Sequence, residues 1–546
     1  MVKKLNKIAS GANNLNGNGK KNGVLNLRKY SCKAKCFDIE AGCVIVVLNE
    51  EEAHVMDIYV SDRVILKHGK KEATVLVDLS DQLVKRGEVG LFSDTSELLG
   101  IKNGDNVEIL HTSKPSSIDF IRKKMDGKTL NGEEMRKIID ETMSNKLSGI
   151  ELASFITAVY TRGLNVDETV SLTNALVESG DTLGLKKKPI VDKHCSGGVA
   201  GNRTTMVMVP VIAAAGLYMP KTSSRSITSA AGTADTMEVL APVEFPVDEM
   251  RRIVERTHGC IVWGGAINLA AADDKLIAIR RPLHLDPRGI LLASILAKKK
   301  SVGAQYVVID LPVGRGAKHE DVNDAKNLAR EFLEIGGKLG MTVDCFLTDG
   351  TDPIGFGIGP SLEAIDVLKV LQNKGPQDLL DKSCQLAGAL LEMSGKVPKG
   401  RGIAAAADII RSGKAYKKML EIIGEQGGNS RVKIDDLNIG TYRHVVKAEQ
   451  TGRISHVDNH AISRIARAAG APKDKGAGII LYCEQGDKVS AGDKLFENVS
   501  ESESKLSFAI KAMEAWEGVE LQKVILGKVS REGGYDHFRK NEWKFK

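Results

Sequence analysis

No pair of cysteines in this chain has the CxxC spacing that is typical of metal and redox sites. The eight cysteines are scattered over 546 residues. Cys32, Cys36 and Cys43 stand near one another, but no adjacent fourth ligand accompanies them, so we do not expect a zinc site. Disulfide frameworks are typical of short secreted domains with clustered cysteines. The cysteine pattern therefore predicts reduced thiols in a cytoplasmic protein without a metal.

Long apolar runs are also missing. The N-terminus lacks an apolar core segment, so no signal peptide is expected. The apolar stretch Met206–Met219 is short for a membrane span and contains Pro210. It is better explained as a buried helix. These absences argue against a membrane protein.

An excess of positive charge is confined to the N-terminal end of the chain. Residues 1–35 carry nine of the 77 Lys and Arg and none of the 70 Asp and Glu, so the rest of the chain is nearly neutral. Binding of nucleic acid by the body of the protein is therefore not expected. Residues 1–28 are rich in Asn, Gly and Lys and predict a disordered basic tail, with an RNA-tethering arm as the alternative.

The length requires more than one hydrophobic core, and about three or four domains are expected. Short β-type runs, then helical periodicity, then alternating strands and helices follow one another. We expect a multidomain α/β protein, in which a helical domain and a mixed or parallel-sheet α/β domain lie between a small N-terminal β-rich domain and a C-terminal α+β sandwich-like subdomain. The expected boundaries are 1–28 for the tail, 30–112 for the β-rich domain, 116–185 for the helical domain, 189–438 for the α/β domain and 439–530 for the C-terminal subdomain.

Local signals support these elements. Asn131 with Glu134 forms a sequence pattern of a helix N-terminus, and Asp167 is a second candidate cap. The segments at 302–311 and 341–349 are apolar and predict buried parallel strands. Each leads into a loop that contains glycine.

Two loops rich in Ser, Thr and Gly are the most informative feature. The first reads D-K-H-C-S-G-G-V-A-G-N-R-T-T from Asp192, and the second reads K-T-S-S-R-S-I-T-S-A-A-G-T-A-D from Lys221. Glycines allow the backbone to approach a ligand, and free N–H groups at a helix start favour an anion. The first loop lacks the G-K-[ST] ending of a Walker A motif. Together the loops predict a site for phosphate and a sugar phosphate, with the candidate contacts Lys193, Ser196, Gly197, Gly198, Thr205, Ser223, Arg225 and Thr233.

The motifs D-K-H-x-x-G-G-V and S-S-R-x-I-T-S-x-A-G-T-A-D resemble those of the nucleoside phosphorylase-II family, which contains thymidine, pyrimidine-nucleoside and AMP phosphorylases. The resemblance runs from about residue 36 to about residue 527. The second motif is the more specific, and its form is most similar to the AMP phosphorylases. The resemblance implies phosphorolysis of a nucleoside 5′-monophosphate (AMP, also CMP or UMP) to a base and ribose 1,5-bisphosphate. It implies no metal or organic cofactor and a homodimer, and residues 273–299 would fold back onto the helical domain.

The same resemblance assigns roles to residues outside the two loops. Asp286 matches a proton donor to the leaving base, for which a raised pKa would be useful; an Asp-Pro turn is the alternative. Lys318 matches a lysine that suits a 5′-phosphate, with an exposed surface lysine as the alternative. The substrate-binding residues would be Gly198, Ser224, Arg225, Ser226, Ile227, Thr228, Ser229, Thr233, Ser294 and Lys318.

Further candidates surround the base. Ser294 and Lys298, four residues apart on one helix face, match a base-contacting pair, and Arg280 is a candidate third member. His194 either faces the base or is a structural hydrogen-bonding residue. The family has a serine where this chain has Cys195, so either Ser196 replaces it or backbone N–H groups bind phosphate alone.

Two other functions are compatible with the sequence. One is a thymidine or pyrimidine-nucleoside phosphorylase of the same fold. The other is a non-catalytic nucleotide- or RNA-binding protein that uses the basic tail. The coexistence of Arg225, Thr233, Asp286 and Ser294 argues against a loss of catalysis.

Overall fold

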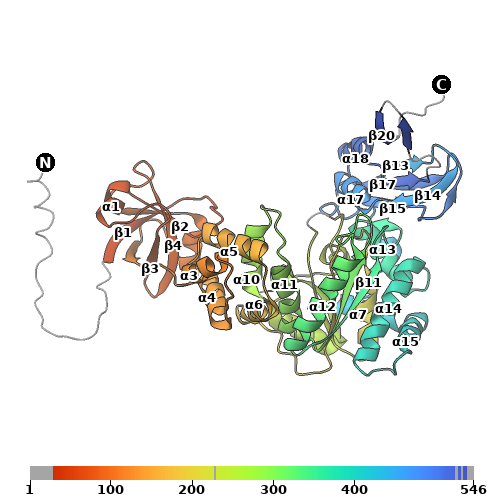
Figure 1. Ribbon diagram of the computed structural model, residues 1–546, viewed down its shortest axis with the longest axis horizontal. Coiled ribbons are helices and arrows are strands. Elements are labelled where there is room, and N and C mark those ends of the chain that lie inside the picture. Colours follow the sequence, from red (N-terminus) through yellow and green to blue (C-terminus); the bar gives the residue numbers. More distant parts are fainter. Residues whose placement is uncertain are drawn as a thin grey trace, which may run out of the picture. The chain divides into compact units, whose positions relative to one another are not determined.

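The computed structural model describes residues 29–112, 114–226, 229–267, 269–522, 527–530 and 533–537. They form two compact units (Figure 1). One unit contains the described residues up to Pro115 together with Ser144–Ser148, and the other contains Ser116–Met143 and the described residues from Gly149 onward. The expected tail at 1–28 lies outside the described residues.

The first unit is a closed barrel with the strand order β1-β5-β2-β4-β3-β6. Side chains alternate along a strand, so β3 and β4 direct Val64, Leu66, Val75 and Val77 into the core, where all are fully buried. The elements are β1 (Lys29–Cys36), β2 (Ile45–Leu48), α1 (Glu50–Val55), β3 (Arg63–His68), β4 (Lys71–Leu79), β5 (Glu88–Leu91), α2 (Ser93–Leu99) and β6 (Asn106–His111).

The second unit begins with a group of helices. These are α3 (Ser117–Met125), α4 (Gly132–Met143), α5 (Gly149–Arg162) and α6 (Val166–Glu178). Two helices from later in the chain pack on them: α10 (Ala271–Arg280) contacts α4, α5 and α6, and α11 (Arg288–Ser301) contacts α5 and α6. The segment that contains Asp286 therefore connects two helices of this group.

One of the two helix caps is confirmed and the other is wrong. The N–H of Glu134 donates to Asn131 Oδ1 and the N–H of Asn131 donates to Glu134 Oε2, both at 2.9 Å. Helix α6, however, is capped by Asn165, which exchanges such bonds with Glu168. Asp167 lies inside the first turn, because the helix begins at Val166, one residue before the predicted cap.

Parallel strands form the centre of the second unit. They are β7 (Val191–Cys195), β8 (Met219–Ser223), β9 (Gly259–Trp263), β10 (Tyr306–Val313) and β11 (Thr342–Asp349). Strands β11-β10-β7 form one sheet and β8-β9 another, and a parallel bridge between Ile190 and Tyr218 connects the two. The helices are α7 (Thr204–Ala214), α8 (Thr233–Met237), α9 (Val247–Thr257), α12 (Val322–Lys338), α13 (Pro360–Leu371), α14 (Gln377–Met393), α15 (Gly402–Arg411) and α16 (Lys414–Glu425).

The apolar segments of this region are buried to different degrees. Helix α7, with Pro210 inside it, is buried on all sides, as expected for a helix between the two loops. Strand β10 is buried over nearly its whole length. Strand β11 is parallel as predicted, but the prediction that it is buried is wrong: it is the edge of the sheet, and Leu347 is 38% exposed. Among the described residues no helix is long and apolar enough to cross a membrane.

The C-terminal segment is attached to the α/β region through a shared sheet. Strand β12 (Gly357–Ile358), which follows β11, pairs with β15 in the sheet β12-β15-β17-β13. Ala200 and Ala230, from the two glycine-rich loops, pack in the same hydrophobic cluster as Ile479. The elements are β13 (Tyr442–Lys447), β14 (Gly452–Val457), α17 (Asn459–Ala468), β15 (Gly478–Leu481), β16 (Lys488–Val489), β17 (Lys494–Ser500), α18 (Glu503–Ala515), β18 (Val519–Leu521), β19 (Gly527–Ser530) and β20 (Gly533–His537).

Candidate active site

Most of the candidate residues lie in three loops that follow parallel strands. Loop 1 (196–203) connects β7 to α7, loop 2 (224–232) connects β8 to α8, and loop 3 (314–321) connects β10 to α12. The carboxyl ends of parallel strands meet at one edge of a sheet, which is where ligands of open α/β sheets bind. Ile227 and Thr228 of loop 2 lie outside the described residues.

Loops 1 and 3 touch each other through their backbones. Gly198 has a φ of +94°, and a Cβ placed on it would lie 2.4 Å from the backbone nitrogen of Lys318. Only glycine fits both the conformation and the space. The phosphate candidate Gly198 and the 5′-phosphate candidate Lys318 are therefore neighbours.

Arg203 connects loops 1 and 2. Its guanidinium donates to the carbonyl of Ala231 at 2.6 Å and to the hydroxyl of Thr233 at 3.4 Å. The buried Glu363 pairs with the same guanidinium. Sequence reasoning identified Thr233 and the positive charge of Arg203 in the first loop motif, but it missed Glu363, which holds the guanidinium.

Loop 2 is organised around Asp235. Its Oδ2 accepts from the N–H of Ser226 at 2.7 Å and from the N–H of Gly232 at 2.9 Å. Ser224 is exposed, whereas Ser226 and Ser229 are half-buried. The hydroxyl of Ser226 donates to the carbonyl of Ser229, so these two candidates are hydrogen-bonded to each other.

Arg225 makes its contacts with carboxylates in this structure. It pairs with Glu238 at 2.6 Å, Glu244 at 2.9 Å and Asp235 at 3.4 Å, and its guanidinium lies 4.8 Å from the Trp263 ring centroid. Its bonds to Glu238 are the largest cause that raises the pKa of Arg225. The predicted phosphate contact by Arg225 would require these ion pairs to open.

Two clusters of buried lysine and aspartate lie beneath the loops. In one cluster, Asp310 is 3.0 Å from Lys193 and 3.4 Å from Lys382. Burial alone would raise the pKa of Asp310, but the two lysines lower it below its usual range. The phosphate candidate Lys193 is therefore held in a buried ion pair, with 1% of its side chain exposed.

The second cluster is centred on Asp192. Lys299 lies 2.6 Å and Lys221 3.8 Å from its carboxylate. Burial and the neighbouring charge of Lys299 lower the pKa of Lys221 to about 7. Across both clusters, four lysines share two aspartates, so these buried groups carry a surplus of positive charge that favours an anion at the strand ends.

We expect anion binding to be coupled to protonation of Lys221. With a pKa of about 7, Lys221 loses its charge as the pH rises above that value, and a bound anion would restore it. The affinity for sulfate, which does not titrate in this range, should therefore fall by up to about tenfold per pH unit above neutrality. Calorimetric titrations across this range measure the slope. The slope should disappear in Lys221→Met, and a slope that persists there would assign the proton to another group.

His194, Cys195 and Ser196 follow one another at the end of β7. Burial and then the charges of Lys299 and Lys221 lower the pKa of His194 well below its usual value, so its imidazole is neutral at neutral pH. Burial raises the pKa of the Cys195 thiol, which accepts from the Asn202 amide at 3.5 Å. The hydroxyl of Ser196 is buried and has no hydrogen-bond partner among the described residues. Ser196 is thus better suited than Cys195 to donate to phosphate.

The structure brings Lys318 together with two candidates from the connection between α10 and α11. Asp286 pairs with Arg280 at 2.5 Å and with Lys318 at 2.9 Å, and 41% of its side chain is exposed. Two ion pairs require the ionised carboxylate, whereas a proton donor must carry a proton. One or both pairs must therefore open before Asp286 can protonate a base.

A second acid, missed by sequence reasoning, joins the base-contacting candidates. Asp273 is fully buried on α10 and accepts from the hydroxyl of Ser294 at 2.6 Å. Lys298 pairs with the same carboxylate and donates to Ser294 at 3.2 Å. Ser294 and Lys298 thus share one helix face, as predicted. The remaining candidates are Gly197, which has a φ of +92° in loop 1, Thr205, which is buried in the first turn of α7, and Ser223, which ends β8.

The helical and α/β parts of this chain both match domains of a known protein family. Residues 118–180 match the helical bundle domain of a glycosyl transferase family, and residues 187–416 match its a/b domain. The predicted combination of a helical and an α/β domain is therefore confirmed. Among solved structures, anthranilate phosphoribosyltransferase from Thermus thermophilus is similar, with 21% identity and a TM-score of 0.49, over 57% of this chain and 100% of that chain.

Curated relatives cover nearly the whole chain. The AMP phosphorylase of Pyrococcus furiosus is 44% identical over 495 residues, which are 90% of this chain and 98% of that protein. The AMP phosphorylase of Thermococcus kodakarensis is 45% identical over 498 residues, which are 91% of this chain and 99% of that protein. At this identity and coverage, the chain belongs to the family of the AMP phosphorylases.

Proposed function

We propose that this protein is a nucleoside 5′-monophosphate phosphorylase that converts AMP and phosphate to adenine and ribose 1,5-bisphosphate. A phosphate oxygen forms a bond to C1′ of the ribose. The N-glycosidic bond breaks, its electron pair goes to the base, and a proton is delivered to the base. CMP and UMP are further candidate substrates. The pairing of Asp286 with Lys318 is the observation that carries this proposal, because it places an acid beside a cation for the 5′-phosphate.

Each part of the reaction has candidate residues. The N–H groups of loop 1 and the unpartnered hydroxyl of Ser196 would hold inorganic phosphate above the buried lysines. The neutral His194 suits an uncharged base, as do Ser294 and Lys298 on α11. Positioning and electrostatic stabilisation would supply most of the rate.

The assembly and cellular context are part of the same proposal. No metal or organic cofactor is required by these roles, because phosphate is the second substrate. We propose a homodimer formed through the helical domain. The eight cysteines are free thiols, which suits the reducing cytoplasm.

The test is phosphorolysis of AMP, CMP, UMP, adenosine and thymidine, measured side by side. We expect AMP to have the highest kcat/KM and adenosine to be a poor substrate. A preference for thymidine would instead make the protein a pyrimidine-nucleoside phosphorylase. Binding of AMP without turnover of any of the five would support a non-catalytic nucleotide-binding protein.

Replacing Lys318 with methionine should remove the preference for the 5′-phosphate. A hydrogen bond to a charged group contributes about 1.5–3 kcal/mol, so kcat/KM for AMP should fall roughly 10–150-fold. The value for adenosine should change little. Lys326→Met, at an exposed lysine of α12, is the control. Equal losses with AMP and adenosine would show that Lys318 stabilises the loop rather than the 5′-phosphate.

A further inference from the structure

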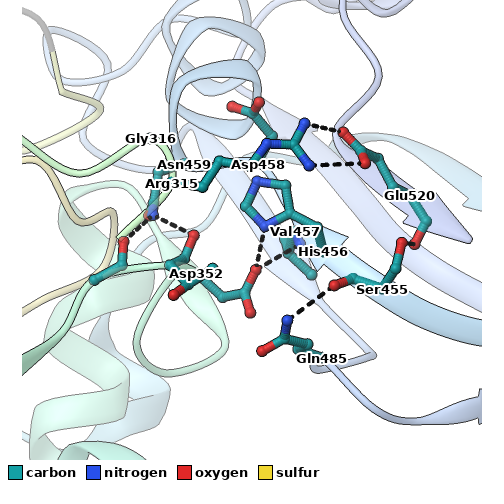
Figure 2. A network of polar contacts seen from close by, with 12 residues as sticks. Arg315, Gly316, Asp352, Ser455, His456, Val457, Asp458, Asn459, Gln485 and Glu520 are labelled. Carbon is teal, nitrogen blue, oxygen red and sulfur yellow. Dashed lines mark hydrogen bonds and ion pairs between the residues drawn. The ribbon is translucent and has the colours of Figure 1, made fainter. Parts of the chain in front are cut away.

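We propose that Glu520 is a positioning residue for the nucleotide site, and that the C-terminal segment thereby sets the affinity for the 5′-phosphate. Glu520 holds Arg315 (Figure 2), and Arg315 lies on the same loop as Lys318. This inference rests on the proposed function and adds to it a determinant that does not touch the substrate.

The contact between the C-terminal segment and loop 3 is a bidentate ion pair. Arg315 Nη2 lies 2.6 Å from Glu520 Oε1, and Nη1 lies 3.1 Å from Oε2. Two parallel bonds of this kind fix direction as well as distance. The bonds to Glu520 are the largest cause that raises the pKa of Arg315, and the charges of Asp458 and Asp352 act in the same direction. The Arg315 guanidinium thus lies among three acids, Glu520, Asp458 and Asp352.

Backbone hydrogen bonds within loop 3 connect the position of Arg315 to that of Lys318. The N–H of Gly314 donates to the carbonyl of His319 at 3.0 Å, and the N–H of Ala317 donates to the carbonyl of Gly314 at 3.1 Å. The backbone at Ala317 and Lys318 lies against Gly198 of loop 1. Arg315 therefore anchors the closed turn that carries Lys318.

Glu520 is itself held in place. It lies on β18, which pairs with β14, and its carbonyl accepts from the hydroxyl of Ser455 at 3.1 Å. Strand β14 is attached to the segment that follows β11, because Asp352 accepts from the N–H of Val457 at 2.7 Å and lies 2.8 Å from His456 Nδ1. Figure 2 shows the Arg315–Glu520 pair close to the contacts of Asp352 with His456 and Val457.

A second anchor from the same segment reaches loop 1. Asn459, which is 2% exposed, accepts from the N–H of Ala200 at 2.9 Å. Its amide nitrogen donates to the carbonyls of Gly350 and Thr351, both at 3.0 Å. A Cβ on Gly314 would lie 2.7 Å from the hydroxyl of Thr351, so the segment that follows β11, which Asn459 holds, packs on loop 3. The C-terminal segment thus restrains loops 1 and 3 by separate contacts.

The two anchors predict different kinetic effects. The Arg315–Glu520 pair acts on the loop that carries Lys318, so its loss should weaken binding of AMP and leave the phosphate site intact. Asn459 acts on loop 1, so its loss should weaken binding of inorganic phosphate. An exposed ion pair contributes little to global stability, so a loss of Glu520 should not unfold the protein.

The experiment compares Glu520→Gln, Arg315→Gln and the charge-reversed double variant Arg315→Glu/Glu520→Arg in the full chain. For both single variants we expect KM for AMP to rise roughly five- to tenfold, with kcat, KM for phosphate and Tm close to wild type. The double variant should recover at least part of the affinity for AMP. Asn459→Asp, which keeps the acceptor and loses both donors, should instead raise KM for phosphate.

Arg136→Gln is the matched control, because Arg136 and Glu178 form an exposed bidentate pair on the helical part. A KM for AMP that stays within about twofold of wild type in Glu520→Gln would overturn the proposal. So would a double variant no better than the single ones, or an equal change in the control. If wild type does not turn over AMP at all, the proposed function fails instead, which separates the two results.

Discussion

Asp286→Asn is expected to lower kcat for AMP by roughly 10²–10⁴-fold, the usual contribution of a general acid. Asparagine keeps the shape of the side chain and can still contact Arg280 and Lys318, but it cannot deliver an acidic proton. The loss should therefore appear in kcat rather than in KM. It should be larger for AMP than for substrates whose base departs without protonation at N7. Steady-state kinetics with AMP and CMP measure both effects.

A nearby acid provides the control. Asp324 on α12 is also exposed and also pairs with an arginine, Arg288 at 2.6 Å. Asp324→Asn therefore removes an ion pair but keeps Asp286, the proposed proton donor. We expect its kinetics to match wild type. If Asp286→Asn raised only KM, Asp286 would be a partner that positions Arg280 and Lys318, and another group would have to protonate the base.

The two ion pairs of Asp286 suggest a second role for the 5′-phosphate. A phosphate dianion competes with a carboxylate for Lys318 and Arg280, because it offers more charge and more acceptor oxygens. When these cations turn to the phosphate, Asp286 loses both of its ion-pair partners. Binding of the correct substrate would then free the Asp286 carboxyl to reach the base.

The parts of the fold that sequence predicted best are those set by local patterns. The short β-type runs that form β3 and β4 and the reciprocal bonds of Asn131 and Glu134 depend on residues close together in the chain. The burial of β11 could not be predicted in this way, because it depends on which strand forms the sheet edge. The join of β12 to β15 also depends on residues that are far apart in the chain.

In the candidate site, too, local sequence patterns could be predicted and contacts between distant residues could not. Loops rich in Ser, Thr and Gly can be recognised in the sequence, and the glycines of loop 1, such as Gly197 and Gly198, have positive φ, whereas Gly232 of loop 2 does not. The role of Lys193 could not be deduced, since its partner Asp310 lies more than one hundred residues away. Two signals were available. Asp310 lies inside the apolar run V-V-I-D-L, and Lys299 follows the apolar residues of α11. A charged side chain among apolar residues requires a buried partner. Asp273 and Asn459 gave no comparable signal.

Gly198→Ala is expected to abolish most activity, with a loss of roughly 10²-fold or more in kcat/KM for AMP, as expected for a displacement of about 1 Å. The added methyl group would lie 2.4 Å from the backbone nitrogen of Lys318. Neither partner is a flexible side-chain end, so loop 1 and loop 3 must separate. That movement would carry the phosphate-binding N–H groups away from the group that holds the 5′-phosphate.

Gly197→Ala separates this effect from backbone strain. Gly197 has nearly the same conformation, with a φ of +92°, but a Cβ there would meet nothing within 4 Å. Both substitutions place alanine in the left-handed region, at a cost of about 1–2 kcal/mol, and only Gly198→Ala adds the clash with loop 3, so Gly197→Ala shows the effect of the backbone strain alone. Only Gly198→Ala should lose most of its turnover. If the two variants lost equal activity, the strain in loop 1 would matter and its contact with loop 3 would not. If Gly198→Ala kept its activity, the two loops would not have to touch for the enzyme to work.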